Sequence, residues 1–201
     1  MIITFFNKKG GTGKTSLAFN CAKSLNEQEI FSPVFLISND DSVIEDIYPN
    51  MAKILEKIEI VKDTNVIYDL GGFIDKDIVE LFKASNIIMI PTMLDINSIK
   101  RTINTVLEIN TYCKNIVIVI NRVKQANINK YKQSIEALKG LGKKIIYIRE
   151  SEAITNSIHL SMSITELYNQ NGLTRSSYKG IYEDYLKLEN YIQEGFKNGT
   201  I

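Results

Sequence analysis

One short segment of the sequence combines glycines, lysines and hydroxyl side chains in a spacing suited to binding a polyphosphate. It lies between an apolar run and a helix-forming stretch and reads Asn7-Lys8-Lys9-Gly10-Gly11-Thr12-Gly13-Lys14-Thr15-Ser16. Glycines let backbone N–H groups turn toward phosphate oxygens, and the positive end of the helix dipole adds to the attraction. Lys14 would contact the β- and γ-phosphates, and the Thr15 hydroxyl would bind Mg²⁺. The segment predicts a phosphate-binding loop (P-loop) in which residues 10–16 contact the nucleotide.

A carboxylate that can support such a site follows another apolar run. Residues 65–69 read Asn-Val-Ile-Tyr-Asp, so Asp69 ends a mostly apolar stretch and is followed by Leu-Gly-Gly. This is the Walker B pattern, which places an aspartate beside Mg²⁺. The pattern alone is common, but together with the P-loop it predicts Asp69 as a metal-site residue.

The rest of the chain supplies elements that can position these residues. Nearly continuous apolar runs predict strands that are covered on both faces, whereas the longer amphipathic stretches between them predict helices. Strand–helix alternation implies right-handed βαβ units, and therefore a doubly wound, mostly parallel α/β sheet with helices on both faces, a three-layer α/β/α P-loop fold in a single domain over residues 1–201. The expected strands are 2–7, 33–38, 65–70, 86–91, 115–121 and 144–149, and the expected helices are 14–27, 43–58, 75–84, 96–112, 128–140, 151–169 and 178–196.

Composition excludes several other classes of protein. The chain has 201 residues, a formal net charge of +1, two cysteines and one histidine. Cys21 and Cys113 cannot build a disulfide framework, and His159 without a cysteine cluster leaves no zinc site. No apolar run reaches the roughly 18 residues that a membrane span needs, and the start is unlike a signal peptide. We therefore expect a cytoplasmic protein.

The P-loop departs from the general G-x-x-x-x-G-K-[ST] form, because Lys8 stands where the first glycine would be. With Lys9 before Gly-Gly it resembles the deviant Walker A motif, K-G-G-x-G-K-[ST], of the ParA and MinD ATPases. The resemblance covers residues 1–125 and continues in the segment 148–167. It implies ATP and Mg²⁺ as cofactors and an ATP-dependent homodimer, in which Lys9 reaches the partner's phosphates.

The same resemblance assigns roles to polar residues at the ends of other strands. The second strand ends Phe-Leu-Ile-Ser-Asn-Asp-Asp-Ser, where Ser38 replaces the first aspartate of the family's D-x-D and Asp40 occupies the second. Asp40 would orient the attacking water and lie near the metal, with Asp41 as the alternative. Asn121 would bind the adenine edge, with Arg122 beside it. The catalytic residues are then Lys9, Lys14 and Asp40, and the metal-site residues are Thr15, Asp40 and Asp69.

Charge is unevenly distributed along this nearly neutral chain. Residues 27–80 hold 13 acidic and 4 basic side chains, whereas residues 122–149 hold 8 basic side chains and 1 acidic one. A basic face can bind DNA without sequence preference by neutralising phosphates, although a lysine-rich solvated helix would look the same. The C-terminal stretch 178–196 has an apolar stripe that favours core packing, because its acidic residues disfavour a membrane anchor.

These observations favour a ParA-like ATPase for plasmid or chromosome partition. In this hypothesis the ATP-bound dimer binds nucleoid DNA through residues 122–149, and a centromere-binding adaptor protein stimulates hydrolysis. The alternative is a MinD-like or cargo-positioning ATPase that acts on a membrane or protein surface. A nitrogenase-iron-protein-like reductase would need cysteines that hold a cluster, and a metabolic kinase would need a separate acceptor site that the sequence does not show.

Overall fold

The computed structural model of the chain describes residues 1–28, 31–39, 42–72 and 74–199. Within these ranges the structure forms a seven-stranded sheet in the order β3-β2-β4-β1-β5-β6-β7, and all strand pairs are parallel. The predicted fold class is confirmed. The strands are β1 (Ile2–Phe6), β2 (Val34–Ser38), β3 (Ala52–Ile54), β4 (Asn65–Leu70), β5 (Ile87–Thr92), β6 (Ile116–Val123) and β7 (Lys144–Arg149).

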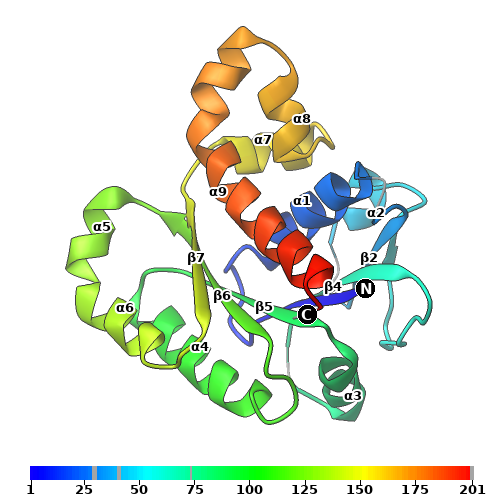
Figure 1. Ribbon diagram of the computed structural model, residues 1–201, viewed down its shortest axis with the longest axis vertical. Helices are drawn as coiled ribbons and strands as arrows, with labels where there is room; N and C mark the ends of the chain where they lie inside the picture. Colours follow the sequence, from blue (N-terminus) through cyan, green and yellow to red (C-terminus); the bar gives the residue numbers. More distant parts are fainter. Residues whose placement is uncertain (29–30, 40–41, 73, 200–201) are drawn as a thin grey trace.

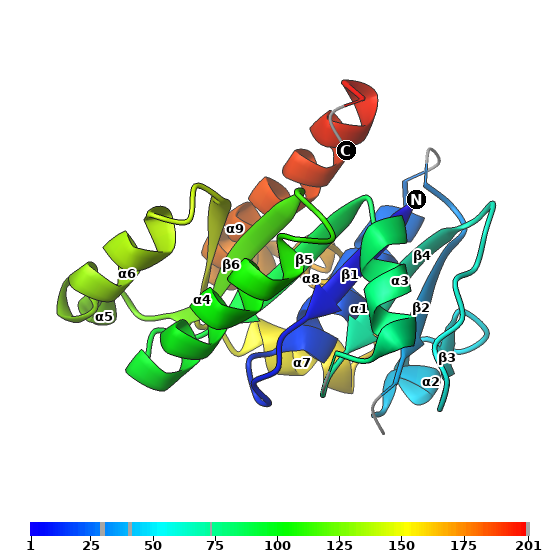
Figure 2. The same cartoon turned by 90° about the horizontal axis from the view of Figure 1, so that it is seen from below.

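Helices cover both faces of this sheet (Figure 1, Figure 2). One core lies between the sheet and α1, α2, α7, α8 and α9, and the other between the sheet and α3, α4 and α6. The strands are therefore buried on both sides, which explains their continuous apolar sequences. The helices are α1 (Lys14–Asn26), α2 (Ile44–Ile47), α3 (Lys76–Ala84), α4 (Ile96–Ile109), α5 (Gln125–Lys130), α6 (Lys132–Lys139), α7 (Ala153–His159), α8 (Ile164–Asn169) and α9 (Gly172–Lys197).

Strand β1 lies between β4 and β5 in the sheet. The chain leaves β1 toward β2 and β4 on one side and later returns to build β5, β6 and β7 on the other side. This reversal of strand order creates a crevice at the carboxyl end of β1, which is where open α/β sheets bind their ligands. The P-loop begins at that end, at Asn7.

The helix predicted over residues 43–58 is wrong. The structure has only α2, a single turn, followed by the edge strand β3. Pro49 cannot continue the hydrogen-bond pattern of a helix, and Asn50 adopts a left-handed backbone with φ of 63°. The apolar residues of this segment reach the core from a turn and a strand instead.

Three other predicted helices differ in their boundaries. The segment 128–140 forms α5 and α6, which are separated at Tyr131, where φ is −107° and ψ is 21°. The segment 151–169 is interrupted at Ser161, where φ is 51°. The last helix begins at Gly172 because the side chain of Asn171 accepts hydrogen bonds from the backbone N–H groups of the first turn. The helix therefore begins six residues before the start at 178 that the apolar spacing indicated.

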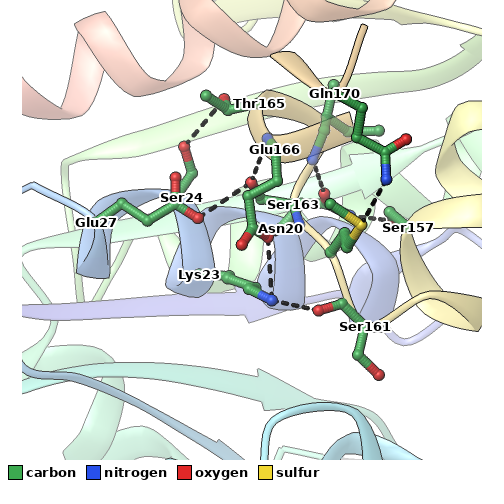
Figure 3. A network of polar contacts seen from close by, with 12 residues as sticks. Asn20, Lys23, Ser24, Glu27, Ser157, Ser161, Ser163, Thr165, Glu166 and Gln170 are labelled. Carbon is green, nitrogen blue, oxygen red and sulfur yellow. Dashed lines mark hydrogen bonds and ion pairs between the residues drawn. The ribbon is translucent and has the colours of Figure 1, made fainter. Parts of the chain in front are cut away.

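Helix α1, which begins at the P-loop, is joined to α7 and α8 by hydrogen bonds and an ion pair (Figure 3). Asn20 donates to Ser157 Oγ at 2.9 Å and accepts from the backbone N–H of Ile164, also at 2.9 Å. Lys23 forms an ion pair with Glu166 at 3.0 Å. Asn20 is fully buried, and its hydrogen bonds to the protein replace those that its amide would make with water. The same bonds fix α1 in position.

The apolar stripe of the C-terminal helix α9 lies in the core. Ile181, Tyr185, Leu188 and Ile192 are each at most 2% exposed, and the helix packs against α8 and β7. This confirms the predicted core packing. Within the described ranges, none of the helices has the length and apolar character needed to cross a membrane.

One carboxyl group is buried between α9 and α1. Glu189 is 4% exposed and lies near Cys21 and Ser24 of α1 and Tyr185 of its own helix. Burial raises the pKa of Glu189 above its ordinary value, and the hydrogen bond from Ser24 offsets only part of this effect. A raised pKa in the folded state means that ionisation of this carboxyl group opposes folding.

We predict that Glu189→Gln stabilises the protein at neutral pH. Below the ordinary pKa of 4.5 the carboxyl is protonated in both states, so the wild-type protein loses nothing. As the pH rises through the folded pKa, wild type loses stability that the glutamine variant keeps. Urea unfolding of both proteins at pH 5 and pH 8 measures the gap, which should widen with pH. Glu194→Gln, on the exposed side of α9, is the control. A gap that is equal at both pH values would contradict this account.

Candidate functional site

The P-loop joins the carboxyl end of β1 to the first turn of α1. Gly11 and Gly13 have left-handed backbones with φ of 74° and 85°, which residues with a Cβ rarely adopt. The backbone N–H of Leu17 then bonds to the Gly13 carbonyl at 3.1 Å and starts the helix. Lys14, the first residue of α1, is 9% exposed. Because the first N–H groups of a helix have no partner within it, the loop faces an incoming phosphate with donors.

Asn121 of β6 supports the second half of the loop. Its Nδ2 donates to the Thr12 carbonyl at 3.1 Å, and its Oδ1 accepts from the backbone N–H of Arg122 at 2.9 Å. The approach is so close that a Cβ at position 13 would lie 2.2 Å from Nδ2 of Asn121. Gly13 is therefore required both by its backbone conformation and by this contact. The sequence pointed to Asn121 as a base contact, and did not predict that it also supports the loop.

Asn7 supports the first half of the loop. Its Nδ2 donates to the Pro91 carbonyl of β5 at 2.7 Å and to Thr102 Oγ1 of α4 at 3.1 Å. Its Oδ1 accepts from the backbone N–H of Lys9 at 2.9 Å. The sequence motifs do not assign this role to Asn7. The available signal is an amide directly after an apolar strand, where a buried polar group must find partners within the protein.

Asp69 lies at the same edge of the sheet as the P-loop. It is 1% exposed, and the parallel register places it opposite Phe5 of β1 and Ser38 of β2. Ser38, where the resemblance led us to expect an aspartate, is fully buried. A carboxylate at position 38 would lie beside that of Asp69, and two buried like charges repel each other. The serine removes this repulsion.

The predicted catalytic Asp40, and its alternative Asp41, lie outside the described residues. The residue before them is bonded into the site. Asn39 donates from Nδ2 to the Gly71 carbonyl at 3.1 Å, and its Oδ1 accepts from the Gly71 backbone N–H at 3.0 Å. This pair of bonds joins the end of β2 to the segment after β4, and so holds Asn39 close to the strand end that carries Asp69.

Arg122 lies on the other side of Asn121. It adopts a left-handed backbone with φ of 52°, in an irregular part of β6 between Ile120 and Val123 where the pairing with β7 shifts. Such bulges redirect side chains at strand ends. The exposed Arg122 borders a pocket of about 580 Å³ that follows β6 and β7, lined also by Glu150, Ser151, Glu152, Ile154 and Thr155.

The two lysines before the glycines both lie near α4. Lys8 forms an ion pair with Glu108 at 2.6 Å, with both side chains about 40% exposed, so the pair contributes little to stability. Lys9 lies close enough to Asp95, the N-cap residue of α4, to lower the pKa of the Asp95 carboxyl group. Partial burial acts to raise the pKa of Asp95, but the Ser98 hydroxyl and backbone and the charge of Lys9 hold it below its ordinary value.

The basic segment 122–149 does not form one continuous charged face. Three of its cations are paired with carboxylates: Arg149 with Asp184 at 2.7 Å, Lys139 with Glu136 at 2.8 Å and Lys124 with Glu150 at 3.0 Å. Lys143 donates to Asn110 Oδ1 at 2.6 Å and to the Lys114 carbonyl at 3.0 Å, so it holds a turn. Arg122, Lys130, Lys132 and Lys144 are also exposed, and Lys130 and Lys132 are the two of these that lie on α5 and α6.

The residues at the carboxyl edge fit a nucleotide with its metal ion. Lys14 at a helix start offers positive charge to the phosphates, and Thr15 and Asp69 are the hydroxyl and carboxylate oxygens that Mg²⁺ prefers. The left-handed backbones of Gly11 and Gly13 give the loop a shape that suits phosphate binding.

This fold and this loop define a P-loop protein with lysines on both sides of its glycines, Lys8 and Lys9 before them and Lys14 after them. The chain belongs to the family described as the CobQ/CobB/MinD/ParA nucleotide-binding domain, whose model matches residues 3–164. No curated protein matches the sequence at a significant level.

Solved structures confirm the fold at low sequence identity. McdA from Cyanothece is 14% identical with a TM-score of 0.65, over 92% of this chain and 98% of that one. MinD from Aquifex aeolicus is 14% identical with a TM-score of 0.63, over 94% and 96% of the two chains. A plasmid partition protein from Borrelia burgdorferi is 16% identical with a TM-score of 0.57, over 92% and 97%.

We predict that Gly13→Ala weakens ATP binding by about tenfold or more, because a left-handed alanine costs about 1–2 kcal/mol and its Cβ displaces Asn121. Calorimetric titration with Mg-ATP measures the change in affinity. Gly142→Ala is the matched control, since Gly142 is also left-handed, with φ of 65°, but has nothing within 4 Å of an added Cβ. Equal ATP affinity of the folded Gly13→Ala variant would show that the loop geometry is not what binds the nucleotide.

Proposed function

We propose that this chain is a ParA-like ATPase of plasmid or chromosome partition. The observation that carries the proposal is a P-loop already shaped for phosphate, with Lys14 buried at the helix start and a second lysine, Lys9, on a backbone held by Asn7. A single lysine suffices to bind a nucleotide. A second lysine before the glycines suits an ATPase that forms a homodimer, in which each subunit contributes to the active site of the other.

Each residue has a defined task in the proposed reaction. Lys14 and the loop N–H groups bind the β- and γ-phosphates, and Asn121 keeps the loop in shape beside the base. Thr15 and Asp69 would hold Mg²⁺, which would supply positive charge to the phosphate oxygens. Asp40 orients a water molecule, whose attack on the γ-phosphorus breaks the bond to the bridging oxygen and yields ADP and inorganic phosphate.

Lys9 acts across a homodimer in this proposal. Its positive charge reaches the phosphates of the partner subunit's ATP, where negative charge develops in the transition state. Structural neighbours support ATP binding and assembly with other proteins: one McdA structure is an ATP complex, and one MinD structure is a complex with MinC. The resemblance to ParA ATPases also implies an adaptor protein, which would bind centromere DNA and stimulate hydrolysis by this chain.

The ATP-bound dimer binds DNA without sequence preference and is located on the nucleoid in the cytoplasm. The exposed cations of α5 and α6, Lys130 and Lys132, are the surface that supports this step. Dimerisation doubles the number of cations that face the DNA phosphates, so DNA binding requires ATP.

The second candidate is a MinD-like or cargo-positioning ATPase, and the similarity to MinD and McdA structures favours it. It shares the nucleotide chemistry and differs in the surface on which the dimer assembles. Because the apolar stripe of α9 is buried in the core, a protein surface fits this chain better than a membrane.

We predict that Lys9→Gln keeps ATP affinity within a few-fold of wild type but weakens the ATP-dependent dimer and slows hydrolysis. The reason is that Lys14 still binds the nucleotide in the same subunit, while the charge supplied to the partner is removed. Light scattering with a slowly hydrolysed ATP analogue measures the dimer, and Lys179→Gln on α9 is the control. Undiminished dimerisation with normal turnover would refute the role of Lys9 across the dimer.

We predict that reversing both Lys130 and Lys132 to Glu weakens binding of the ATP-loaded protein equally for all DNA sequences. The log–log dependence of affinity on salt should flatten by about 0.9 for each DNA phosphate that the variant no longer neutralises. Reversal of Lys179 and Lys197 on α9 changes the net charge by the same amount and is the control. If wild-type protein with ATP ignores DNA at low salt, the positioning ATPase replaces the partition ATPase as the better proposal.

A further inference from the structure

The amide of Asn7 joins three separate elements at the start of the P-loop. Both N–H bonds of its Nδ2 are used, one to the Pro91 carbonyl of β5 at 2.7 Å and one to Thr102 Oγ1 of α4 at 3.1 Å. Its Oδ1 is thereby turned toward the backbone N–H of Lys9, from which it accepts a hydrogen bond at 2.9 Å. Asn7 and Thr102 are both fully buried, so water cannot replace the two bonds that Nδ2 donates.

The orientation of this amide depends on Thr102. An asparagine amide can turn about its last bond, and only the pattern of donors and acceptors around it selects one orientation. The Pro91 carbonyl and the Thr102 hydroxyl fix the NH₂ side, which leaves the oxygen for Lys9. Removal of the Thr102 oxygen would leave a buried N–H without its acceptor and would release the amide from this orientation.

The two ends of the P-loop are held independently. The end near Lys14 is supported by Asn121 through the Thr12 carbonyl at 3.1 Å, whereas the end near Lys9 is supported by Asn7. The charge of Lys9 also lies near Asp95, the cap of the same helix α4 that carries Thr102, and this charge helps to lower the pKa of Asp95. Helix α4 is therefore linked to the Lys9 end of the loop in two ways, by the hydrogen bond between Thr102 and Asn7 and by the electrostatic interaction of Asp95 with Lys9.

We propose that Asn7 and Thr102 are positioning residues for Lys9, and that they transmit the position of α4 to the backbone of this lysine. The proposal rests on the proposed role of Lys9 in ATP turnover by a dimer. Since Lys14 is held by a different asparagine, disturbing Thr102 should affect the dimer-dependent step and leave nucleotide binding largely intact. A merely structural role for Thr102 would affect both equally, through overall stability.

The test compares three variants of α4. Thr102→Val removes the oxygen at nearly constant volume, Thr102→Ser keeps it, and Thr105→Val is the matched control. Thr105 is also fully buried on α4, but its hydroxyl donates to the Arg101 carbonyl of the same helix at 2.9 Å. Three quantities are measured for each protein: the Kd for Mg-ATP, the kcat of ATP hydrolysis, and the hydrogen-exchange rate of the Lys9 amide by ¹⁵N NMR.

We expect Thr102→Val to speed exchange of the Lys9 amide and to lower kcat, each by about tenfold, as removal of one buried hydrogen bond implies, while Kd stays within a few-fold. Thr102→Ser should behave like wild type, and Thr105→Val should change neither exchange at Lys9 nor the ratio of kcat to Kd. Equal effects of Thr102→Val and Thr105→Val would overturn the proposal, as would unchanged exchange at Lys9. Failure of wild type to hydrolyse ATP refutes the proposed function instead, and is recognised because the exchange measurement needs no nucleotide.

Discussion

The contact between Gly13 and the side chain of Asn121 is the constraint on which the site depends. A side-chain amide from β6 lies so close to the loop that any Cβ at position 13 would collide with it, and the same amide bonds to the Thr12 carbonyl. Contacts within the protein thus help to shape the loop. Holding a loop in a conformation suited to its ligand strengthens binding, because less ordering is needed when the ligand binds. Asn7 does the same for the other end of the loop.

The rest of the fold keeps these two amides in place. Asn7 directly follows β1 and Asn121 lies near the end of β6, and both strands are buried on both faces of the sheet. Helix α1 must also stay fixed, since it carries Lys14. Its bonds from Asn20 to α7 and α8, and the core between α1 and the sheet, prevent it from sliding. Packing far from the site therefore sets the geometry of the phosphate loop.

Much of this arrangement could be predicted from the sequence, since continuous apolar runs and a glycine-lysine motif are local signals. The layers, the parallel sheet and the family are confirmed. The predictions that were wrong also have local causes: Pro49 and Asn50 end the helix predicted over 43–58, and Ser161 interrupts the one predicted over 151–169. The supporting roles of Asn7 and Asn121 could not be predicted, because they depend on contacts 84 to 109 residues apart in the chain. The spacing of residues in a sequence indicates which residues can act on a ligand. It indicates less readily which other residues hold those residues in position.

The central claim is that the loop between β1 and α1 binds ATP through Lys14. Calorimetric titration of Mg-ATP into wild type and Lys14→Ala tests it most directly, with Lys179→Ala on α9 as the control and circular dichroism to confirm that each protein is folded. The account predicts one ATP bound per chain in wild type and in the control, and an affinity lower by about a hundredfold or more in Lys14→Ala, since a buried charge-assisted hydrogen bond to phosphate contributes about 3 kcal/mol. Equal affinity of wild type and Lys14→Ala for ATP would contradict it.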